Sequence, residues 1–449
     1  MSNARMLTPH LPLLFFSLPR PSLSSLLSLP ALPILLVSPT EMKFGAASLV
    51  LLAASAAARS PSPPVTRLSV GPNGDSVLLS PVGLLVTSLQ YGTTPTDGAL
   101  VPGGVGAEVT QALTNVAAIF ASAGLDLSAS ASSCWMYLKS DIVDSGFDDA
   151  SDAYKAFFKN ATHPTRSPTG VGFSLEGASA AVECHGFRDD KAAVSIPGFF
   201  ETDFNSQGVL LKDDLLLYTS GQIAFDPASE TLVEGGIGAE TSQVLSNLDV
   251  VFSAAFPNGG SLSQNAAECQ VLVRGDDSDL STVKSLFSTF FESRLPALSY
   301  TFGDPGAGAS VEAACLGFSP SPTRRALPID PKGLPLGAGL LLKDAAGPDL
   351  LYTSLLRGVL AKTVRQEVDG AVAAVSRVFE EAFPSLGASA LPQAAAYCNL
   401  VVSDGKFAQE ANEALDDVFE EENVKPARST IVAGIEGGAR VALRCWGAR

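Results

Sequence analysis

Six regularly spaced cysteines constrain the fold of this 449-residue chain more than any other feature. They form an early set (Cys134, Cys269 and Cys398, 135 and 129 residues apart) and a late set (Cys184, Cys315 and Cys445, 131 and 130 residues apart). Along the chain, each early cysteine is thus followed by one late cysteine. A fixed internal period of this kind indicates tandem copies of one structural unit.

Short motifs recur between the cysteines in the same order, which supports the internal repeat. VTSLQ, YTSGQ and YTSLL mark corresponding points of the three copies, and GGVGAE and GGIGAE follow the first two. The sequence therefore predicts three copies of one domain, at residues 75–188, 207–319 and 336–449. The intervening segments 188–207 and 319–335 are expected to be linkers, the second because it holds several prolines.

Hydrophobic periodicity predicts the same order of elements in each copy. A short apolar hairpin comes first. An amphipathic helix follows, in which apolar residues keep the i, i+3, i+4, i+7 spacing, as in Val109, Ala112, Val116 and Phe120. A strand carries the early cysteine, a second helix ends in aromatic residues, and the last of two final strands carries the late cysteine. The predicted fold class is α+β, with the order β-β-α-β-α-β-β.

The N-terminal sixty residues differ from the rest of the chain. Residues 1–41 are rich in Leu, Pro and Ser, and are expected to be a low-complexity extension outside the mature protein. Residues 42–60 begin with Met42 and combine one lysine, an apolar core and small residues, which is typical of a secretory signal peptide. The protein is then expected to be secreted or to lie in an endomembrane or organelle lumen. An apolar cytosolic N-terminus is the alternative.

Composition and missing motifs exclude several classes of function. The net charge of −17 disfavours nucleic acid as a partner, because the chain would repel phosphates. No apolar run after the signal approaches the length needed to span a bilayer. HExxH, CxxC, P-loop and GxSxG motifs are absent from the sequence, so no metal, cofactor or serine-hydrolase site is expected.

Four short motifs resemble the RidA (reactive intermediate deaminase, YjgF-like) family. They are the TSGQ turn at 219–222, the helix end YKAFF at 154–158, and the Pro-x-Arg-Ser motifs at 164–167 and 426–429. The resemblance implies chorismate-mutase-like domains, which in this family form homotrimers with a central barrel and a pocket in each cleft between subunits. Three linked copies are then expected to form an intramolecular pseudo-trimer that is monomeric in solution.

The resemblance also assigns catalytic roles. In the family, the arginine of Pro-x-Arg-Ser binds the carboxylate of a small 2-imino acid, and a glutamate on the last strand assists hydrolysis to a 2-keto acid and ammonia. In the first copy these roles fall to Arg166 and Glu183. A planar guanidinium binds a carboxylate through paired hydrogen bonds, and a carboxylate can act as a general base. The alternative is a structural ion pair, or two separate exposed charges.

The second and third copies keep less of this pattern. Leu298 replaces the arginine in the second copy, and aligning the cysteines places Ala314 at the glutamate position, with Glu312 two residues earlier on the same strand face. The third copy keeps Arg428 but has Arg444 at the glutamate position. Only the first copy is therefore expected to hold the complete pair.

Further residues are expected to bind substrate. They are Arg428, Ser220 and Gly221 of the TSGQ turn, and Ser88 at the corresponding turn of the first copy, where leucine replaces the glycine. His185 lies two residues from Glu183, hence on the same strand face, and could line the pocket. A packed or solvent-exposed histidine is the alternative.

The cysteines and one sequon permit covalent modification. In the family's sheet the strands carrying the two cysteines are antiparallel neighbours, which allows the disulfides Cys134–Cys184, Cys269–Cys315 and Cys398–Cys445 in a secreted protein. Six buried thiols are the alternative, because disulfide geometry across strands is restrictive. Asn160 begins a glycosylation sequon that is usable only in the secretory route.

Two classes of function follow from these observations. The first is a RidA-like hydrolase of small reactive imino or enamine acids, with one surviving cleft. The second is a secreted pseudo-trimer without catalysis, which binds small carboxylate metabolites or serves as a scaffold. Survival of Arg166 and Glu183 favours the enzyme, and loss of the pair in two copies favours the second class.

Overall fold

The computed structural model describes residues 65–69, 75–79, 83–159, 161–188, 190–197, 199, 205–211, 216–292, 294–319, 321–345, 347–420 and 425–449. Residues from Ala58 to Arg449 form one compact unit. The expected extension at 1–41, the expected signal at 42–60 and the sequon asparagine Asn160 lie outside the described residues.

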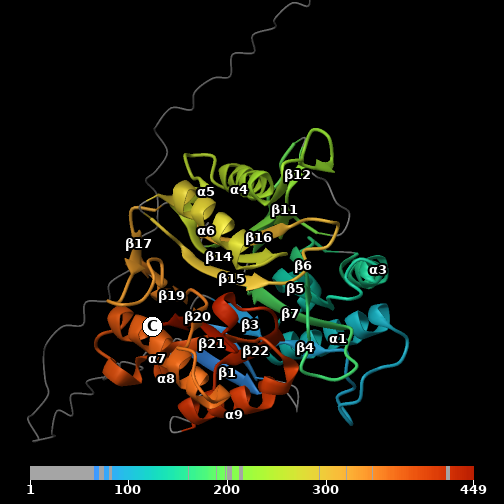
Figure 1. Cartoon of the computed structure of the whole chain (residues 1–449). Helices are drawn as coiled ribbons and strands as arrows, with labels where there is room; N and C mark the ends of the chain where they lie inside the picture. Colours follow the sequence, from blue (N-terminus) through green and yellow to red (C-terminus); the bar gives the residue numbers. More distant parts are fainter. Residues whose placement is uncertain are drawn as a thin grey trace, which may run out of the picture. The chain divides into compact units, whose positions relative to one another are not determined.

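Three seven-stranded sheets with one common strand order make up most of this unit (Figure 1). In the first sheet the order is β1-β2-β3-β7-β5-β6, and the short strand β4 pairs with β7. Its strands are β1 (Val65–Ser69), β2 (Asp75–Leu79), β3 (Leu84–Thr87), β4 (Gln90–Tyr91), β5 (Ala131–Lys139), β6 (Thr165–Val171) and β7 (Ala180–Phe187).

The second and third sheets repeat this arrangement. The second has the order β8-β9-β10-β16-β14-β15 with β11 on β16, and the third has β17-β18-β19-β23-β21-β22 with β20 on β23. The strands of the second are β8 (Lys191–Ala193), β9 (Gly208–Leu211), β10 (Leu216–Thr219), β11 (Gln222–Ile223), β14 (Ala266–Val273), β15 (Ala297–Phe302) and β16 (Val311–Phe318). Those of the third are β17 (Arg324–Ile329), β18 (Gly339–Asp344), β19 (Leu350–Thr353), β20 (Leu356–Arg357), β21 (Ala395–Val402), β22 (Ala427–Val432) and β23 (Val441–Ala448). A separate hairpin joins β12 (Phe225–Asp226) to β13 (Thr231–Leu232).

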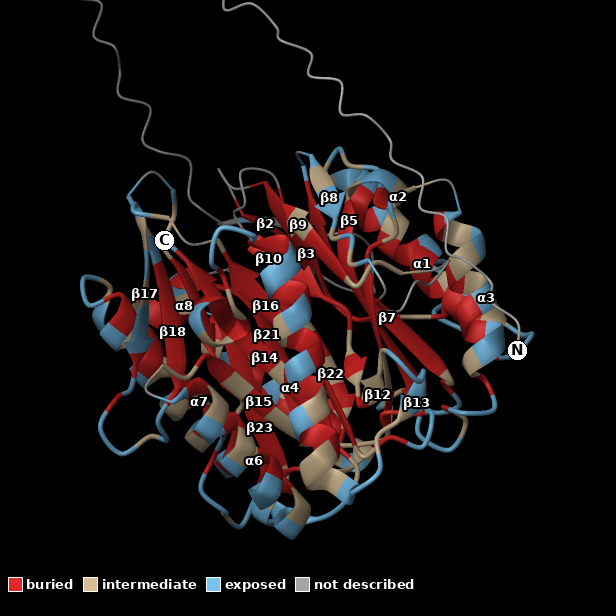
Figure 2. Cartoon of the chain, turned by 90° about the horizontal axis from the view of Figure 1, so that it is seen from above, coloured by how far each residue is buried: buried red, intermediate tan, exposed pale blue. Residues whose placement is uncertain are grey.

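Two long helices cover one face of each sheet, as the periodicity predicted. The pairs are α1 (Val105–Ser122) with α3 (Phe147–Phe158), α4 (Gly236–Ala255) with α6 (Asp277–Phe291), and α7 (Val364–Ala382) with α9 (Ala408–Phe419). Shorter turns of helix precede the central strands or second helices: α2 (Leu127–Ser130), α5 (Leu262–Asn265), α8 (Ala390–Ala394) and the 3₁₀ segments Gly387–Ser389, Gly405–Phe407 and Glu436–Gly438. Figure 2 shows that the helices expose their outer sides while the central strands are buried; the edge strands β8 and β17 are partly exposed.

A glycine two residues after each late cysteine explains how the first long helix of each copy packs so closely on its sheet. A Cβ on Gly186 would lie 2.2 Å from the ring of Phe120 on α1, and a Cβ on Gly447 would lie 2.5 Å from the ring of Phe379 on α7. The corresponding contact in the second sheet joins Gly317 to Phe252. Any larger residue would displace the aromatic anchor of the helix.

The buried apolar residues form four clusters. Three of them lie between a sheet and its own helices, around Phe120, Phe252 and Phe379. The fourth joins the other faces of all three sheets, and contains Trp135, Tyr218, Tyr397 and Trp446. Each sheet is thus buried on both sides: its helix face packs on its own helices, and the opposite face, here called the inner face, packs on the other sheets.

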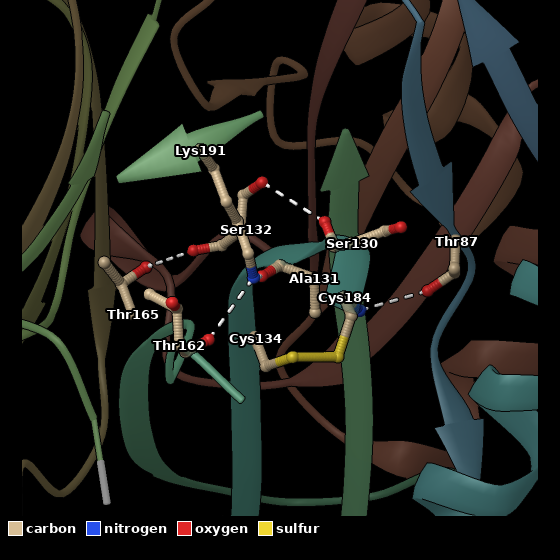
Figure 3. Close-up of a disulfide and its surroundings, with 9 residues drawn as sticks. All are labelled: Thr87, Ser130, Ala131, Ser132, Cys134, Thr162, Thr165, Cys184 and Lys191. Atoms are coloured by element: carbon tan, nitrogen blue, oxygen red, sulfur yellow. Dashed lines mark hydrogen bonds between the residues drawn. A yellow bond between two sulfur atoms is a disulfide. The ribbon is translucent and has the colours of Figure 1, made fainter. Parts of the chain in front are cut away.

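Three disulfides join the cysteines in the expected pairs. Cys134–Cys184, Cys269–Cys315 and Cys398–Cys445 each link directly opposed residues of neighbouring antiparallel strands, with 4.1 Å between the Cα atoms. Figure 3 shows the first bridge between β5 and β7, with the Cys184 amide donating to Thr87 Oγ1 on β3 over 3.1 Å. The described residues therefore contain disulfides at all six positions and not buried thiols.

Two expectations about the fold need correction. The segments 188–207 and 319–335, expected to be linkers, contribute the edge strands β8 and β17, which pair with β9 and β18. The described strands also form separate sheets and not one closed, hydrogen-bonded barrel. The sheets meet at isolated bridges that join Gly170 to Asp304, Gly172 to Val432 and Phe302 to Gly434.

Candidate functional site

Arg166 lies on the edge strand β6 and points to the helix face of the first sheet. It stands directly beside Cys134 in the parallel β5–β6 pair, so the two side chains share a face. Its Nη1 donates to Ser151 Oγ over 2.9 Å, and its guanidinium lies 5.2 Å and 5.5 Å from the ring centres of Phe147 and Tyr154 on α3. Burial lowers the pKa of Arg166 to about 10, so the group stays charged at neutral pH.

The TSGQ turn of the second sheet packs against this strand. The Arg166 amide donates to Ser220 Oγ over 2.9 Å, and the Gly221 amide donates to the Arg166 carbonyl over 3.1 Å. Asn205 Nδ2 also donates to Ser220 Oγ over 2.9 Å. The structure thus brings Arg166, Ser220 and Gly221 together where the first and second sheets meet, a position here called the Arg166 cleft.

The carboxyl group in this cleft belongs to Glu312. Its strand β16 is the last strand of the second sheet, and a Cβ added to Gly221 would lie only 1.7 Å from Glu312 Oε1. Burial raises the pKa of Glu312 to about 8, although the nearby positive charge of Arg166 acts in the opposite direction. Within the described part of the chain, Glu312 Oε2 is buried and has no hydrogen-bond partner.

Glu183, which the sequence paired with Arg166, lies on the other face of the first sheet. Glu183 pairs with Trp135 on β5, whereas Arg166 pairs with the preceding residue, Cys134. Because side chains alternate between faces, Glu183 points inward while Arg166 points toward α3. The expected pair of Arg166 and Glu183 in one cleft is therefore not what the structure contains; Glu312 stands near Arg166 instead.

Glu183 has its own partners on the inner face. Its carboxylate accepts hydrogen bonds from Tyr137 Oη over 3.1 Å, from Tyr397 Oη over 3.1 and 3.2 Å, and from Ser429 Oγ. Burial raises its pKa in spite of these bonds. Glu183 thus connects the first and third sheets through these hydrogen bonds.

His185 and Arg444 also lie on the inner face. The His185 ring packs 4.9 Å from Trp135 and 4.8 Å from Trp446 between ring centres, and burial lowers its pKa to about 3, so it is neutral. Arg444 forms a buried ion pair with Glu268. Neither residue shares the helix face with Arg166.

The two other clefts lack part of the arrangement. In the cleft between the second and third sheets, Leu298 replaces the arginine, and its amide donates to Ser354 Oγ over 2.8 Å. Leu355 and Ala442 occupy the positions that Gly221 and Glu312 have in the Arg166 cleft. In the other, Arg428 forms an ion pair with Asp416 over 3.0 Å.

Beside Arg428 lies a turn of the first sheet, which corresponds to the 219–222 turn of the second. It holds the buried Ser88, whose hydroxyl accepts from Gln90 Nε2 over 3.0 Å, and Leu89 in place of glycine. Ala181 stands at the Glu312 position. Only the Arg166 cleft therefore combines an arginine, a glycine and a carboxyl group.

The signal for Glu312 was present in the sequence but ambiguous. When the late cysteines are aligned, the glutamate position is the residue immediately before each cysteine. That position is Glu183 in the first copy, whereas Glu312 lies three residues before Cys315. The glycine of TSGQ was the better indicator, since only a residue without a side chain leaves room for the carboxyl group beside it.

Among the described residues, no helix is long and apolar enough to cross a membrane, and no group of three or more His, Cys, Asp or Glu side chains is arranged to hold a metal ion. The Arg166 cleft thus combines one guanidinium and one buried carboxyl group in an α+β scaffold.

Comparison with known proteins identifies the family. The chain is 40% identical over 92 residues to the 2-iminobutanoate/2-iminopropanoate deaminase of Rattus norvegicus, which covers 20% of this chain and 62% of the relative. It is 38% identical over 100 residues to the enzyme of the same name from Mus musculus, covering 22% and 70%. A solved structure of a conserved Rid family protein from Yersinia pestis matches 29% of this chain and 99% of its own, with 26% identity and a TM-score of 0.26.

No family model matches the sequence. The mouse relative nevertheless is matched over more than two thirds of its length at more than 30% identity, and the chain belongs to the RidA family. The chain spans about 62% of the length of the first relatives, and each match covers only about a fifth of this chain.

Proposed function

We propose that the chain hydrolyses small reactive 2-imino acids to 2-keto acids and ammonia in the cleft of Arg166, Gly221 and Glu312. The observation that carries this proposal is the combination of a buried charged guanidinium and a buried carboxyl group on either side of a glycine turn. The names of the curated relatives, which are 2-iminobutanoate/2-iminopropanoate deaminases, support the same reaction.

Each group has a distinct role in this reaction. Arg166 binds the substrate carboxylate and orients the imine carbon. The protonated Glu312 carboxyl donates its proton to the imine nitrogen, and the resulting carboxylate accepts a proton from the attacking water as the C–O bond forms. Glu312 then protonates the amine nitrogen; the C–N bond breaks, ammonia leaves, and the hydroxyl proton returns to Glu312 as the carbonyl forms. The net change is imine plus water to ketone plus ammonia.

The three sheets are best explained as three tandem RidA-like domains that form an intramolecular pseudo-trimer around a central barrel-like interior. The common strand order, the shared inner cluster and the bridges between sheets support this arrangement. Covalent linkage makes assembly independent of protein concentration, and we propose that the chain is monomeric. It also lets each cleft diverge, so one cleft can keep catalysis while two lose it.

The three disulfides support a secreted or lumenal location, reached through the signal expected at residues 42–60. N-terminal sequencing of the protein recovered from the medium of expressing eukaryotic cells tests this. Cleavage near residue 60 is expected. Recovery only from the cytosol with an intact residue 42 would contradict the location.

Imine hydrolysis can be tested directly. An amino acid oxidase or a serine/threonine dehydratase generates the imine in situ, and the chain is expected to accelerate release of the keto acid. Arg166→Met and Glu312→Gln should each lower kcat/KM by about 100-fold or more, because each removes a group that contacts the reacting molecule. Arg428→Met is the matched control and should leave the rate unchanged. Equal rates in all four proteins would overturn the proposal.

The pH profile gives a second measure. The reaction starts from the protonated form of Glu312, whose pKa is raised to about 8, so kcat/KM should fall as the pH rises through about 8. In Glu312→Gln this descending limb should disappear, since an amide does not titrate. A wild-type profile that increases above pH 8 would assign the proton transfer to another group.

Binding without turnover is the second candidate, favoured by the loss of the complete arrangement in two of the three clefts. Calorimetric titration with 2-oxobutanoate separates the two. Arg166-dependent heat without any acceleration of imine hydrolysis would favour the binding protein, and heat together with acceleration would favour the enzyme.

A further inference from the structure

A cavity of about 50 Å³ lies on the inner faces of the sheets, directly behind the Arg166 cleft. All three sheets contribute to its wall. Polar side chains on that wall include Ser167 of the first sheet, Gln270, Thr301 and Glu312 of the second, and Asn399 and Arg444 of the third. We call this space the inner cavity.

The strand registers place these side chains in two adjacent layers. Glu312 is level with Leu272 and Thr301, whereas Gln270 is level with Ser299 and Ala314, one step further along the sheet. In the third sheet Asn399 is level with Arg444 and Ser429. Along the second sheet, a molecule that enters from Glu312 therefore meets Gln270 next, and Asn399 of the third sheet lines the same cavity.

The Arg166 cleft and the inner cavity share walls. Glu312 lines the cavity, and its Oε1 lies against Gly221. Ser167, which also lines it, directly follows Arg166 on β6. Leu355 also lines the cavity. It belongs to the third sheet, at the position that corresponds to Gly221 in the second. A substrate side chain placed above Gly221 and directed inward would reach the same space.

The hydrogen-bonding groups of the cavity suit an uncharged polar occupant. Gln270 makes no side-chain hydrogen bond to other described residues, and Asn399 uses only Nδ2, which donates to Tyr397 Oη over 3.4 Å. Two amides thus keep both donors and acceptors for a ligand. Arg444 offers no surplus positive charge, because it is ion-paired with Glu268 and Glu183 is a second buried carboxyl group nearby. The wall itself holds one carboxyl group, that of Glu312, and this ion-paired guanidinium, so an anionic side chain would find no unpaired positive charge there.

The volume limits the occupant to a short group. A water needs about 10–15 Å³ measured in this way, so the inner cavity of about 50 Å³ holds on the order of three to five non-hydrogen atoms. A carboxamide has three. The wall also includes the apolar side chains of Val271, Val401 and Ile431, which suit one methylene carbon that leads to the amide.

We infer that the inner cavity binds the substrate side chain and selects 2-imino acids whose short side chain ends in an uncharged amide, the imine of asparagine being of the right size. The inference rests on the proposed hydrolysis and names its preferred substrate class. Gln270 and Asn399 are the specificity-determining residues: they hydrogen-bond the amide, whereas Arg166 and Glu312 act on the imino acid group common to all substrates.

Three isosteric imines test the selection. The side chains of asparagine, leucine and aspartate have the same number and connectivity of non-hydrogen atoms, and they end in an amide, a pair of methyl groups and a carboxylate. With imines generated from these amino acids by a broad-specificity oxidase, kcat/KM for the asparagine imine should exceed the other two by about tenfold, the value of one net hydrogen bond of about 1.4 kcal/mol. Gln270→Met, which keeps the length and removes the amide, should abolish that preference. The surface variant Gln409→Met is the control, and should keep it.

Binding of the products distinguishes the possible failures. Calorimetry should show 2-oxosuccinamate binding about tenfold more tightly than 4-methyl-2-oxopentanoate, and Gln270→Met should remove the difference. Equal hydrolysis of all three imines, with equal binding of the two keto acids, would overturn the side-chain selection and leave the proposed hydrolysis intact. A binding preference for the amide without any hydrolysis would instead overturn the reaction and retain the cavity's role in recognition.

Discussion

Burial acts in opposite directions on the two ionisable groups of the cleft. It lowers the pKa of Arg166 to about 10 and raises the pKa of Glu312 to about 8. At neutral pH the Arg166 guanidinium remains charged, while the Glu312 carboxyl group is protonated in most molecules. The empty cleft therefore offers one positive charge and one transferable proton, and a ligand carboxylate meets no fixed negative charge at Glu312. This state suits an anionic substrate that must be protonated before water attacks it.

Gly221 is the residue that admits the Glu312 carboxyl group to this position. In Gly221→Ala the new Cβ would lie 1.7 Å from Glu312 Oε1, so the carboxyl group must move. We expect kcat of imine hydrolysis to fall at least about tenfold, since displacing a catalytic group by about 1 Å can cost up to 100-fold.

Gly238→Ala provides the matched control for this substitution. Gly238 lies near the start of α4, and a Cβ there would have only Thr282 at 4.0 Å. This variant should keep full activity and gain about 0.5–1 kcal/mol in stability, because alanine favours the helix. Thermal unfolding measures the second effect. An unchanged kcat in Gly221→Ala would show that the position of Glu312 does not matter for the reaction.

At the scale of the strands, alternation of side chains determines which residues can act together. The sequence was sufficient to predict the helices and the strand that carries each cysteine, because these follow from local periodicity. The cysteine pairs were implied only by the resemblance to the RidA family, with six buried thiols as the alternative, and the structure forms the disulfides. The sequence was insufficient for the partner of Arg166. That residue lies on the edge strand β6, so its neighbour is supplied by another sheet, and the cysteine alignment pointed to Glu183 on the opposite face.

The edge strands β8 and β17 illustrate a similar limit. Their segments contain prolines and short apolar runs, which are typical of linkers when considered locally. They become strands because β9 and β18 would otherwise leave unpaired backbone groups at the edge of each sheet. Pairing of this kind depends on the completed sheet and leaves little trace in composition.

The three disulfides occupy corresponding strands, yet only one adjoins the proposed catalytic arginine. Cys134 is directly beside Arg166 in the β5–β6 pair. Replacing both Cys134 and Cys184 by alanine should lower the free energy of unfolding by about 2–4 kcal/mol, as expected for a loop of this size, and should also reduce imine hydrolysis.

The Cys398/Cys445 double alanine variant is the control. Its disulfide closes a loop of similar length, with a sequence separation of 47 against 50, and should cost similar stability. Its activity should equal that of the wild type at temperatures where both proteins are folded. Denaturant unfolding and the imine assay provide the two measurements. Equal loss of activity in the two double variants would show a general effect of stability and not a local effect on Arg166.

At the scale of the whole molecule, charged residues on the inner faces differ between the three sheets. Glu183 belongs to the first, Glu268 to the second and Arg444 to the third, and all three are buried. Glu183 accepts from Tyr397 and Ser429 of the third sheet, and Glu268 is ion-paired with Arg444 of the same sheet. Identical copies could not form such unlike contacts, so these residues fit a single chain whose sheets have diverged to complement one another.

The Glu268–Arg444 pair permits a quantitative test of that complementarity. Removing one member leaves a buried charge without its partner, so Arg444→Leu alone should lower the free energy of unfolding by about 3–5 kcal/mol. Replacing both residues by leucine removes both charges and their desolvation cost, and should be much closer to the wild type, or even more stable. Chemical denaturation of the wild type, both single variants and the double variant gives the coupling energy. If the double variant lost as much stability as the two single variants together, the two residues would be independent, and the ion pair would contribute nothing to joining the second and third sheets.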